Sequence, residues 1–159
     1  MARRGRRGRI IDKDRGWNRI KREIARVRRR KPHVQVGIFG DEAAEDRGGI
    51  TNVQVAAIHE FGLPPMPERS FLRATFDMKA REIAQLAKNL RWRVFVGTMS
   101  NAKALGLLGA FVKGEVQKRM SRGIPPPLDP ATIRRKGSSV PLIDTGQLRG
   151  SINYEVKNV

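Results

Sequence analysis

The residues most able to do chemistry lie in the stretch VPLIDTGQLRGSINYEV, residues 140–156. Two apolar residues precede Asp144-Thr145-Gly146, and this order is typical of the catalytic loop of an aspartic protease. Such an enzyme needs two carboxylates that share one proton, so a dimer would have to supply both copies of Asp144. The structural alternative is a helix start, in which Asp144 or Thr145 accepts hydrogen bonds from free backbone N–H groups.

The surroundings of this triplet favour the structural alternative. Only 13 residues follow Gly146, too few for the β-rich body that holds a flap and a substrate cleft. Gln147 stands where such enzymes usually have a small residue. We therefore expect no catalytic residue and interpret the triplet as a turn that begins a short helix. The apolar residues expected to pack inward around it are Leu142, Ile143 and Leu148.

A second candidate for chemistry is HEFG, residues 59–62. It lacks the second histidine, four residues further on, that a zinc-binding helix requires. The other histidine, His33, is 26 residues away from His59, and the absence of cysteine excludes thiolate sites. We expect no metal and no cofactor. HEFG is instead predicted to end a helix, with Phe61 buried and Gly62 as the αL stop.

Positive charge is the strongest feature of the composition. The chain has 33 Lys and Arg against 15 Asp and Glu, and 15 of the basic residues lie in residues 1–31 with only 3 acidic ones. An arm of this density attracts polyanions without reading sequence. Contact with nucleic acid, docking on an acidic protein surface and plain solubility are the alternatives. The candidate contact residues of the arm are Arg3, Arg4, Arg6, Arg7, Arg9, Arg28, Arg29 and Arg30.

Apolar spacing predicts the elements that position these residues. Residues 1–31 form one part, a disordered or extended basic arm that ends in a helix, and residues 32–159 form the other. Gly106, Gly109 and Gly114 are expected to let a neighbouring helix approach. Phe71 and Phe76 are expected in the core. The predicted helices are 16–30, 52–61 with Asn52 as its cap, 70–96, and a fourth that follows a break at 97–100 and ends near Gly123; the predicted strands are 34–40 and 151–156.

The remaining segments are predicted as loops and connectors. Residues 41–51 are acidic and then Gly-rich, without apolar periodicity, which indicates a loop. Residues 63–67 (LPPMP) predict a stiff, extended connector. Residues 123–139 predict a protruding loop that could contact a neighbour or line a channel, and residues 131–139 within it (ATIRRKGSS) are expected to form a short helix or turn. Candidate contact residues in these segments and beside them are Pro64, Pro65, Arg69, Arg134, Arg135 and Lys136.

Three stretches occur in a recognisable order: AAIHEFG (56–62), PPMPERSFLRATF (64–76) and PLIDTGQLRGSI (141–152). Together they resemble the neck and tail-completion proteins of tailed bacteriophages, which are minor virion-morphogenesis proteins at the head–tail junction. The resemblance covers roughly residues 34–156. The chain departs from the shared pattern at Glu68, where a small residue is common, and at Ser70, where proline is usual.

The resemblance implies an α+β fold, in which a small antiparallel sheet packs against one or two long helices. It implies a structural virion protein, made in the host cytoplasm, that joins or completes head and tail as a homo-oligomeric ring, expected to be six-fold. The implied partners are further copies, neighbouring neck and tail-tube or terminator proteins, and genomic DNA as a further candidate, but no membrane. Glu60 is then expected to face Arg69 or Arg73 of its own or a neighbouring chain. The alternative classes are a non-specific nucleic-acid-binding protein and the aspartic protease.

Overall fold

A computed structural model describes residues 17–44, 49–137, 142 and 146–158 of the chain. The chain divides into two compact units, Met1–Lys31 and Pro32–Val159. The first unit contains α1 (Trp17–Arg30), which confirms the predicted helix to within one residue. Trp17 and Ile24 of its apolar stripe are exposed, and Lys21 Nζ lies 5.8 Å from the centroid of the Trp17 ring. The predicted arm residues before Trp17 lie outside the described residues.

The second unit contains a two-stranded antiparallel sheet. One strand lies near the beginning of this unit and the other near its end. β1 (His33–Ile38) pairs with β2 (Ile152–Lys157), with His33 opposite Lys157 and Ile38 opposite Ile152. Both strands lie within two residues of their predicted bounds. A two-stranded sheet is marginal alone and needs a packed face.

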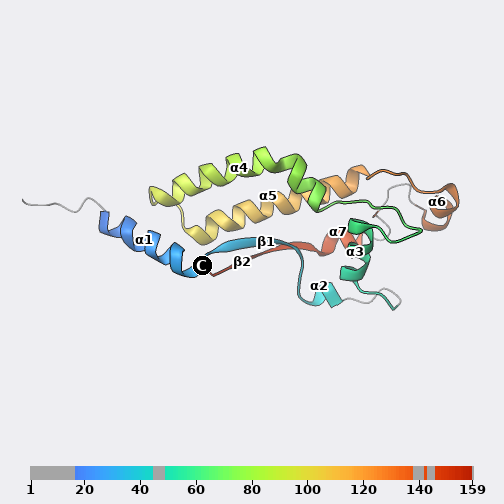
Figure 1. The fold of residues 1–159 in the computed structure, drawn as a ribbon, viewed down its shortest axis with the longest axis horizontal. Coiled ribbons are helices and arrows are strands. Elements are labelled where there is room, and N and C mark those ends of the chain that lie inside the picture. Colours follow the sequence, from blue (N-terminus) through green and yellow to red (C-terminus); the bar gives the residue numbers. More distant parts are fainter. Residues whose placement is uncertain (1–16, 45–48, 138–141, 143–145, 159) are drawn as a thin grey trace, which may run out of the picture. The chain divides into compact units, whose positions relative to one another are not determined.

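A long helical hairpin supplies that packing. α4 (Arg73–Phe95) and α5 (Asn101–Arg122) run side by side, and α5 contacts α4 and both strands (Figure 1). Ser100 caps α5 by accepting a hydrogen bond from the Lys103 N–H at 3.2 Å. The chain therefore has the expected α+β fold, a small antiparallel sheet against two long helices.

Gly109 fixes how closely α5 lies on the sheet. A Cβ atom built at this position would lie 2.6 Å from Tyr154 Cδ2 and 2.7 Å from Val34 Cγ2, which is impossible without a shift. The predicted close approach is therefore real at Gly109, but it is to the sheet and not to a neighbouring helix. Nothing lies within 4 Å of the corresponding position at Gly114.

Two short helices lie in the connecting segments. α2 (Asp41–Ala44) lies in the segment predicted as a loop, so that prediction is wrong there. α6 (Pro130–Lys136) confirms the short helix or turn predicted within the protrusion. Asp129 caps α6 through its carboxylate, which accepts from the Ala131 N–H at 2.7 Å. Four acidic and alanine residues after Gly40 thus form one helical turn, which apolar periodicity cannot reveal because the helix is too short.

One helix cap falls one residue from its predicted place. α3 (Asn52–Phe61) is capped by Thr51, not Asn52, and Thr51 and Gln54 form a reciprocal capping box. α7 (Gln147–Ser151) confirms the short helix after the Asp-Thr-Gly triplet and has Gly146 at its N-cap position. The expected capping residues, Asp144 and Thr145, lie outside the described residues.

The core lies where the far half of α5 meets the start of α4, α7 and the end of the sheet. Val116 and Met120 of α5 are completely buried, and Phe71 is 2% exposed. Phe76 is 40% exposed, so its predicted core position is wrong. Among the described residues, no helix is long and apolar enough to cross a membrane. The other buried apolar residues of the core are Val112, Ile124, Leu142, Leu148 and Ile152.

Candidate interaction site

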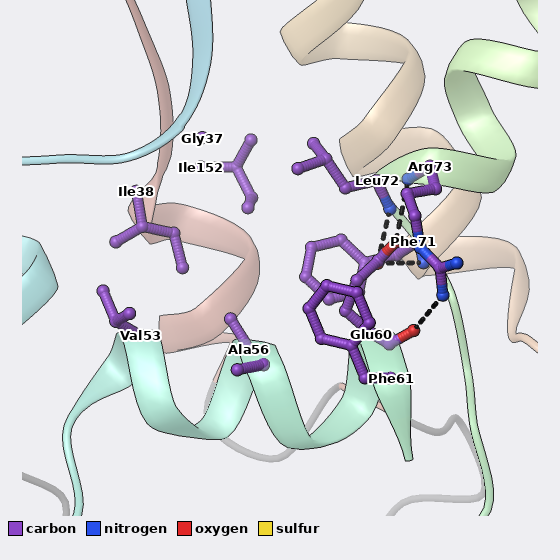
Figure 2. A pocket seen from close by; sticks show the side chains of 11 residues that line it. Gly37, Ile38, Val53, Ala56, Glu60, Phe61, Phe71, Leu72, Arg73 and Ile152 are labelled. Atoms are coloured by element: carbon purple, nitrogen blue, oxygen red, sulfur yellow. Dashed lines mark hydrogen bonds and ion pairs between the residues drawn. The ribbon is translucent and has the colours of Figure 1, made fainter.

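A buried carboxylate joins the end of α3 to the start of α4. Glu60 is 5% exposed and accepts hydrogen bonds from the backbone N–H groups of Phe71, Leu72 and Arg73, each at 2.9 Å (Figure 2). The Ser70 hydroxyl donates to it at 2.8 Å. The Arg73 N–H belongs to the first turn of α4, where N–H groups have no acceptor within the helix, and the N–H groups of Phe71 and Leu72 lie directly before it. Leu72, at the N-cap, offers no side-chain acceptor, so Glu60 caps α4 from a different helix.

The protonation of Glu60 follows from these contacts. Burial raises the pKa of the carboxyl group, but the backbone N–H groups of Leu72 and Arg73, the Ser70 hydroxyl and the Phe71 N–H outweigh it, and the pKa lies below its ordinary value. A negative charge at a helix N-terminus is also favoured by the helix dipole. Glu60 is therefore a charged structural group whose oxygens are occupied by this chain.

Arg73 covers the same carboxylate from the solvent side. Its Nε donates to Glu60 Oε1 at 3.2 Å, and its Nη2 donates to the Glu60 carbonyl and to Glu68 Oε1, both at 2.8 Å. The expectation that Glu60 faces an arginine is thus confirmed for Arg73 of its own chain. The guanidinium lies 4.9 Å from the centroid of the Phe61 ring. Phe61 is 65% exposed, so its predicted burial is wrong.

Gly62, which follows Phe61, ends α3 as predicted but not in the αL conformation. Its φ is 76° and its ψ is 151°. A Cβ atom at this position would lie 3.0 Å from the Glu68 backbone nitrogen. Both the backbone conformation and the close approach of the chain that leads into α4 favour glycine here.

An apolar groove of about 240 Å³ lies beside this network, between α3, the end of the sheet and the start of α4. Gly37 and Ile38 of β1 and Ile152 of β2 form one side of it (Figure 2). The three motif stretches of the sequence meet here, since the first supplies α3, the second the start of α4 and the third Ile152. The remaining residues that line the groove are Val53, Ala56, Ala57, Glu60, Phe61, Phe71, Leu72 and Arg73.

Arg69, predicted as a contact residue for a partner, is used inside the chain. It is 6% exposed, and its guanidinium donates to the carbonyls of Pro126 and Pro127 at 3.0 and 3.4 Å. It therefore ties the proline-rich segment after α5 to the entry of α4. The prediction did not account for this bond because the two segments are 57 residues apart in sequence.

Pro64 and Pro65 are exposed, as a contact segment requires, but they do not form an extended connector. The Leu63 N–H donates to the Met66 carbonyl at 3.0 Å, and the Met66 N–H donates to the Leu63 carbonyl at 2.6 Å. The segment is therefore a tight reverse turn with both prolines at its apex. Leu63 is 54% exposed and Met66 is 42% exposed.

The other predicted contact residues lie on separate elements. Arg28, Arg29 and Arg30 form the exposed last turn of α1. Arg134, Arg135 and Lys136 belong to α6, and Arg134 is exposed. The predicted residues outside the described part of the chain are Arg3, Arg4, Arg6, Arg7 and Arg9.

The sequence reasoning missed an exposed cluster at the turn between α4 and α5, which we call the hairpin tip (residues 88–103). Trp92 is 62% exposed, Phe95 53% and Val96 47%, and the rings of Trp92 and Phe95 stack with centroids 5.6 Å apart. These two aromatic residues fall outside the apolar stripe that packs α4, and this mismatch in spacing was the available indication. The hairpin tip also carries four exposed cations: Lys88, Arg91, Arg93 and Lys103.

Comparison with known proteins adds no relative. A scan against protein-family models and searches of curated proteins and of solved structures found no match. In the part of the chain that the structure describes, no group of three or more His, Cys, Asp or Glu residues could hold a metal ion.

Proposed function

We propose that this chain is a structural virion protein of a tailed phage, which joins or completes the head–tail junction as a homo-oligomeric ring. The observation that carries the proposal is the meeting of the three motif stretches in one place. Glu60 of the first stretch caps the helix that begins in the second, and Ile152 of the third lines the groove beside them. If the chain shares its fold with the phage family that it resembles, the three motifs should pack together although they are far apart in sequence.

The chemistry of this unit suits assembly more than catalysis. The carboxylate of Glu60 has a lowered pKa and accepts hydrogen bonds from four consecutive residues of its own chain, so it has no proton to transfer near neutral pH. We propose no catalytic role for Asp144 either. If the chain were an aspartic protease, Asp144→Asn would abolish peptide cleavage, whereas a structural residue there would leave no such activity to lose.

The partners in this proposal are further copies, the neighbouring neck and tail-tube or terminator proteins, and genomic DNA. Exposed apolar and cationic side chains are the groups that such contacts use. Such surfaces among the described residues include the last turn of α1, the turn at Pro64 and Pro65, and the hairpin tip.

Cryo-electron microscopy of the head–tail junction in purified particles tests the proposal directly. We expect a ring of six or twelve copies of this chain at the junction. The proposal would be overturned if infectious, and therefore complete, particles did not contain the chain. The same maps would show which proteins contact α1 and the hairpin tip.

A non-specific nucleic-acid-binding protein is the second candidate, and the exposed arginines of α1 favour it. The last turn of this helix carries Arg28, Arg29 and Arg30 without an acidic neighbour in the same turn. Phosphate contacts made by such residues release counterions, so affinity for DNA falls steeply with salt. Binding of duplex DNA by the isolated chain, with a steep salt slope and with the chain absent from particles, would establish this alternative.

A further inference from the structure

Two surfaces of the unit Pro32–Val159 expose apolar side chains at opposite ends of α4. The groove lies at the N-terminal end, where Leu72 and Arg73 line it, and the hairpin tip lies at the C-terminal end with Trp92 and Phe95. We propose that the hairpin tip of one copy docks into the groove of a second copy, head to tail. This inference rests on the proposed function, because it names the contact that would build the ring.

The tip cannot reach the groove of its own copy. α4 has 23 residues, and at 1.5 Å per residue this corresponds to about 34 Å between its two ends. The distance between the tip and the groove of the same copy is fixed, because α5 packs along α4 and contacts the sheet closely at Gly109. A contact between tip and groove therefore joins two molecules.

The sizes and chemistry of the two surfaces match. The groove has a volume of about 240 Å³, whereas a cavity of roughly 150 Å³ already holds a benzene molecule. It therefore has room for one aromatic ring of the tip. The tip offers Trp92, Phe95 and two neighbouring arginines, and Trp and Arg are enriched among the residues that dominate binding energy at interfaces.

The charges of the two surfaces are also complementary. Between Glu82 and Glu115 the sequence has no acidic residue, so the cations of the tip have no carboxylate from this segment to offset them. Beside the groove, α2 (Asp41–Ala44, sequence DEAA) contacts α3 and carries acidic residues but no basic one. The cation that lines the groove, Arg73, is already paired with Glu60 and Glu68. Two tips would repel each other, whereas a tip and the α2 side of a groove attract.

A contact between two different surfaces has a consequence for assembly. Each copy keeps a free groove when its tip is bound, and a free tip when its groove is bound, so every added copy has the same orientation relative to the one before it. Such heterologous contacts close into rings when the rotation between copies allows it and otherwise form filaments. The contact thus explains growth by identical steps without a second kind of interface.

Three variants of the full chain test the contact, all at exposed positions. Trp92→Ala combined with Phe95→Ala removes the aromatic part of the tip. Val53→Arg places a cation at the groove, where Val53 is 44% exposed. Trp17→Ala is the matched control, since Trp17 is an equally exposed tryptophan on α1, 60% exposed. Circular dichroism and thermal unfolding establish that each variant keeps its fold.

Sedimentation velocity over a range of protein concentrations is the measurement. We expect the unmodified chain and Trp17→Ala to self-associate equally, and the tip and groove variants to associate at least about tenfold more weakly. A mixture of the tip variant with the groove variant should form dimers and nothing larger. The reason is that one intact groove meets one intact tip, while the remaining tip and groove are defective.

Several results would overturn the contact. They are a monomeric unmodified chain at the highest soluble concentration, self-association of the tip variant equal to that of the unmodified chain, and absence of dimers in the mixture. Loss of affinity for duplex DNA in the tip variant, with self-association intact, would assign the tip to nucleic acid instead. The presence of the chain in particles is measured separately, so a ring at the junction with a different contact would sink this inference and leave the proposed function standing.

Discussion

The two ends of α4 are treated in opposite ways by the rest of the chain. At the N-terminal end, Glu60 and Arg73 hold the charges and the free N–H groups in one network. At the C-terminal end, Trp92 and Phe95 stack on each other in contact with solvent, and the hairpin tip also carries exposed cations. The polar groups at the N-terminal end are satisfied within the fold, whereas the rings at the C-terminal end are accessible to a binding partner. The two ends of α4 therefore have different roles, one in stabilising the fold and one in offering a binding surface.

The largest expected effect comes from removing the network at the first end. Glu60→Ala leaves the N–H groups of Phe71, Leu72 and Arg73 without their acceptor in a buried place. We expect the free energy of unfolding to fall by about 3 kcal/mol, measured by urea denaturation with circular dichroism.

Glu82→Gln is the matched control for this prediction. Glu82 pairs with Lys79 on the surface of α4, and exposed pairs of this kind contribute little to stability. An equal loss of stability in the two variants would show that Glu60 is no more than a surface charge, and the contrast between the two ends of α4 would disappear.

Acid should weaken the same end by a smaller amount. The pKa of Glu60 is lowered below 4.5 in the folded chain, so its stabilising contribution is fully present above pH 4.5 and is lost as the pH falls through the folded value. Glu60→Gln carries no titrating group at this position. We expect the difference in unfolding free energy between the unmodified chain and Glu60→Gln to be constant above pH 4.5 and to narrow below it. A difference that does not change with pH would contradict this assignment.

The position of the hairpin depends on the close packing of α5 on the sheet at Gly109. Two glycine variants can measure how much this packing contributes to stability. Gly109→Ala forces a Cβ atom against Tyr154 and Val34, which should cost about 1–3 kcal/mol. Gly114→Ala meets nothing within 4 Å in the same helix and should stabilise the chain by up to about 1 kcal/mol. Thermal unfolding of both variants checks the signs. Two changes of the same sign would mean that helix propensity, and not contact with the sheet, decides this region.

The smallest effect on stability is expected at the hairpin tip. Trp92→Ala and Phe95→Ala remove rings that are more than half exposed, and substitutions at such positions usually change the free energy of unfolding by about 0.5 kcal/mol or less. Urea denaturation of each variant measures this. A loss as large as that of Glu60→Ala would place the tip in the folding core and would remove the basis for a binding surface there.

Local patterns in the sequence were enough for most elements. Apolar spacing predicted α1, α3, α4, α5 and the two strands, and Gly62 and the break at Gly97 predicted where helices end. Apolar spacing over a long segment reports which face of an element is buried, and this information is contained in the segment itself. An element of a single turn, such as α2, carries too few residues for such a pattern.

The candidate site could be predicted only in part. From charge alone, the sequence indicated that Glu60 would face Arg69 or Arg73 of its own or a neighbouring chain, and the structure selects Arg73 of its own chain. It did not indicate that Glu60 caps α4, that Arg69 bonds the carbonyls of Pro126 and Pro127, or that Phe61 and Phe76 stay exposed. Hydrogen bonds between distant segments leave no periodic trace in either segment, so no local pattern could have indicated them.

The sequence by itself therefore determined the type and order of the elements and the excess of positive charge. Tertiary structure alone decided which charged side chains form hydrogen bonds and ion pairs within the chain and which face solvent. The physical reason is that a carboxylate such as Glu60 is stabilised by hydrogen-bond donors that folding brings to it. The ring of Trp92, in contrast, lies at the turn of the hairpin and stays more than half exposed among the described residues.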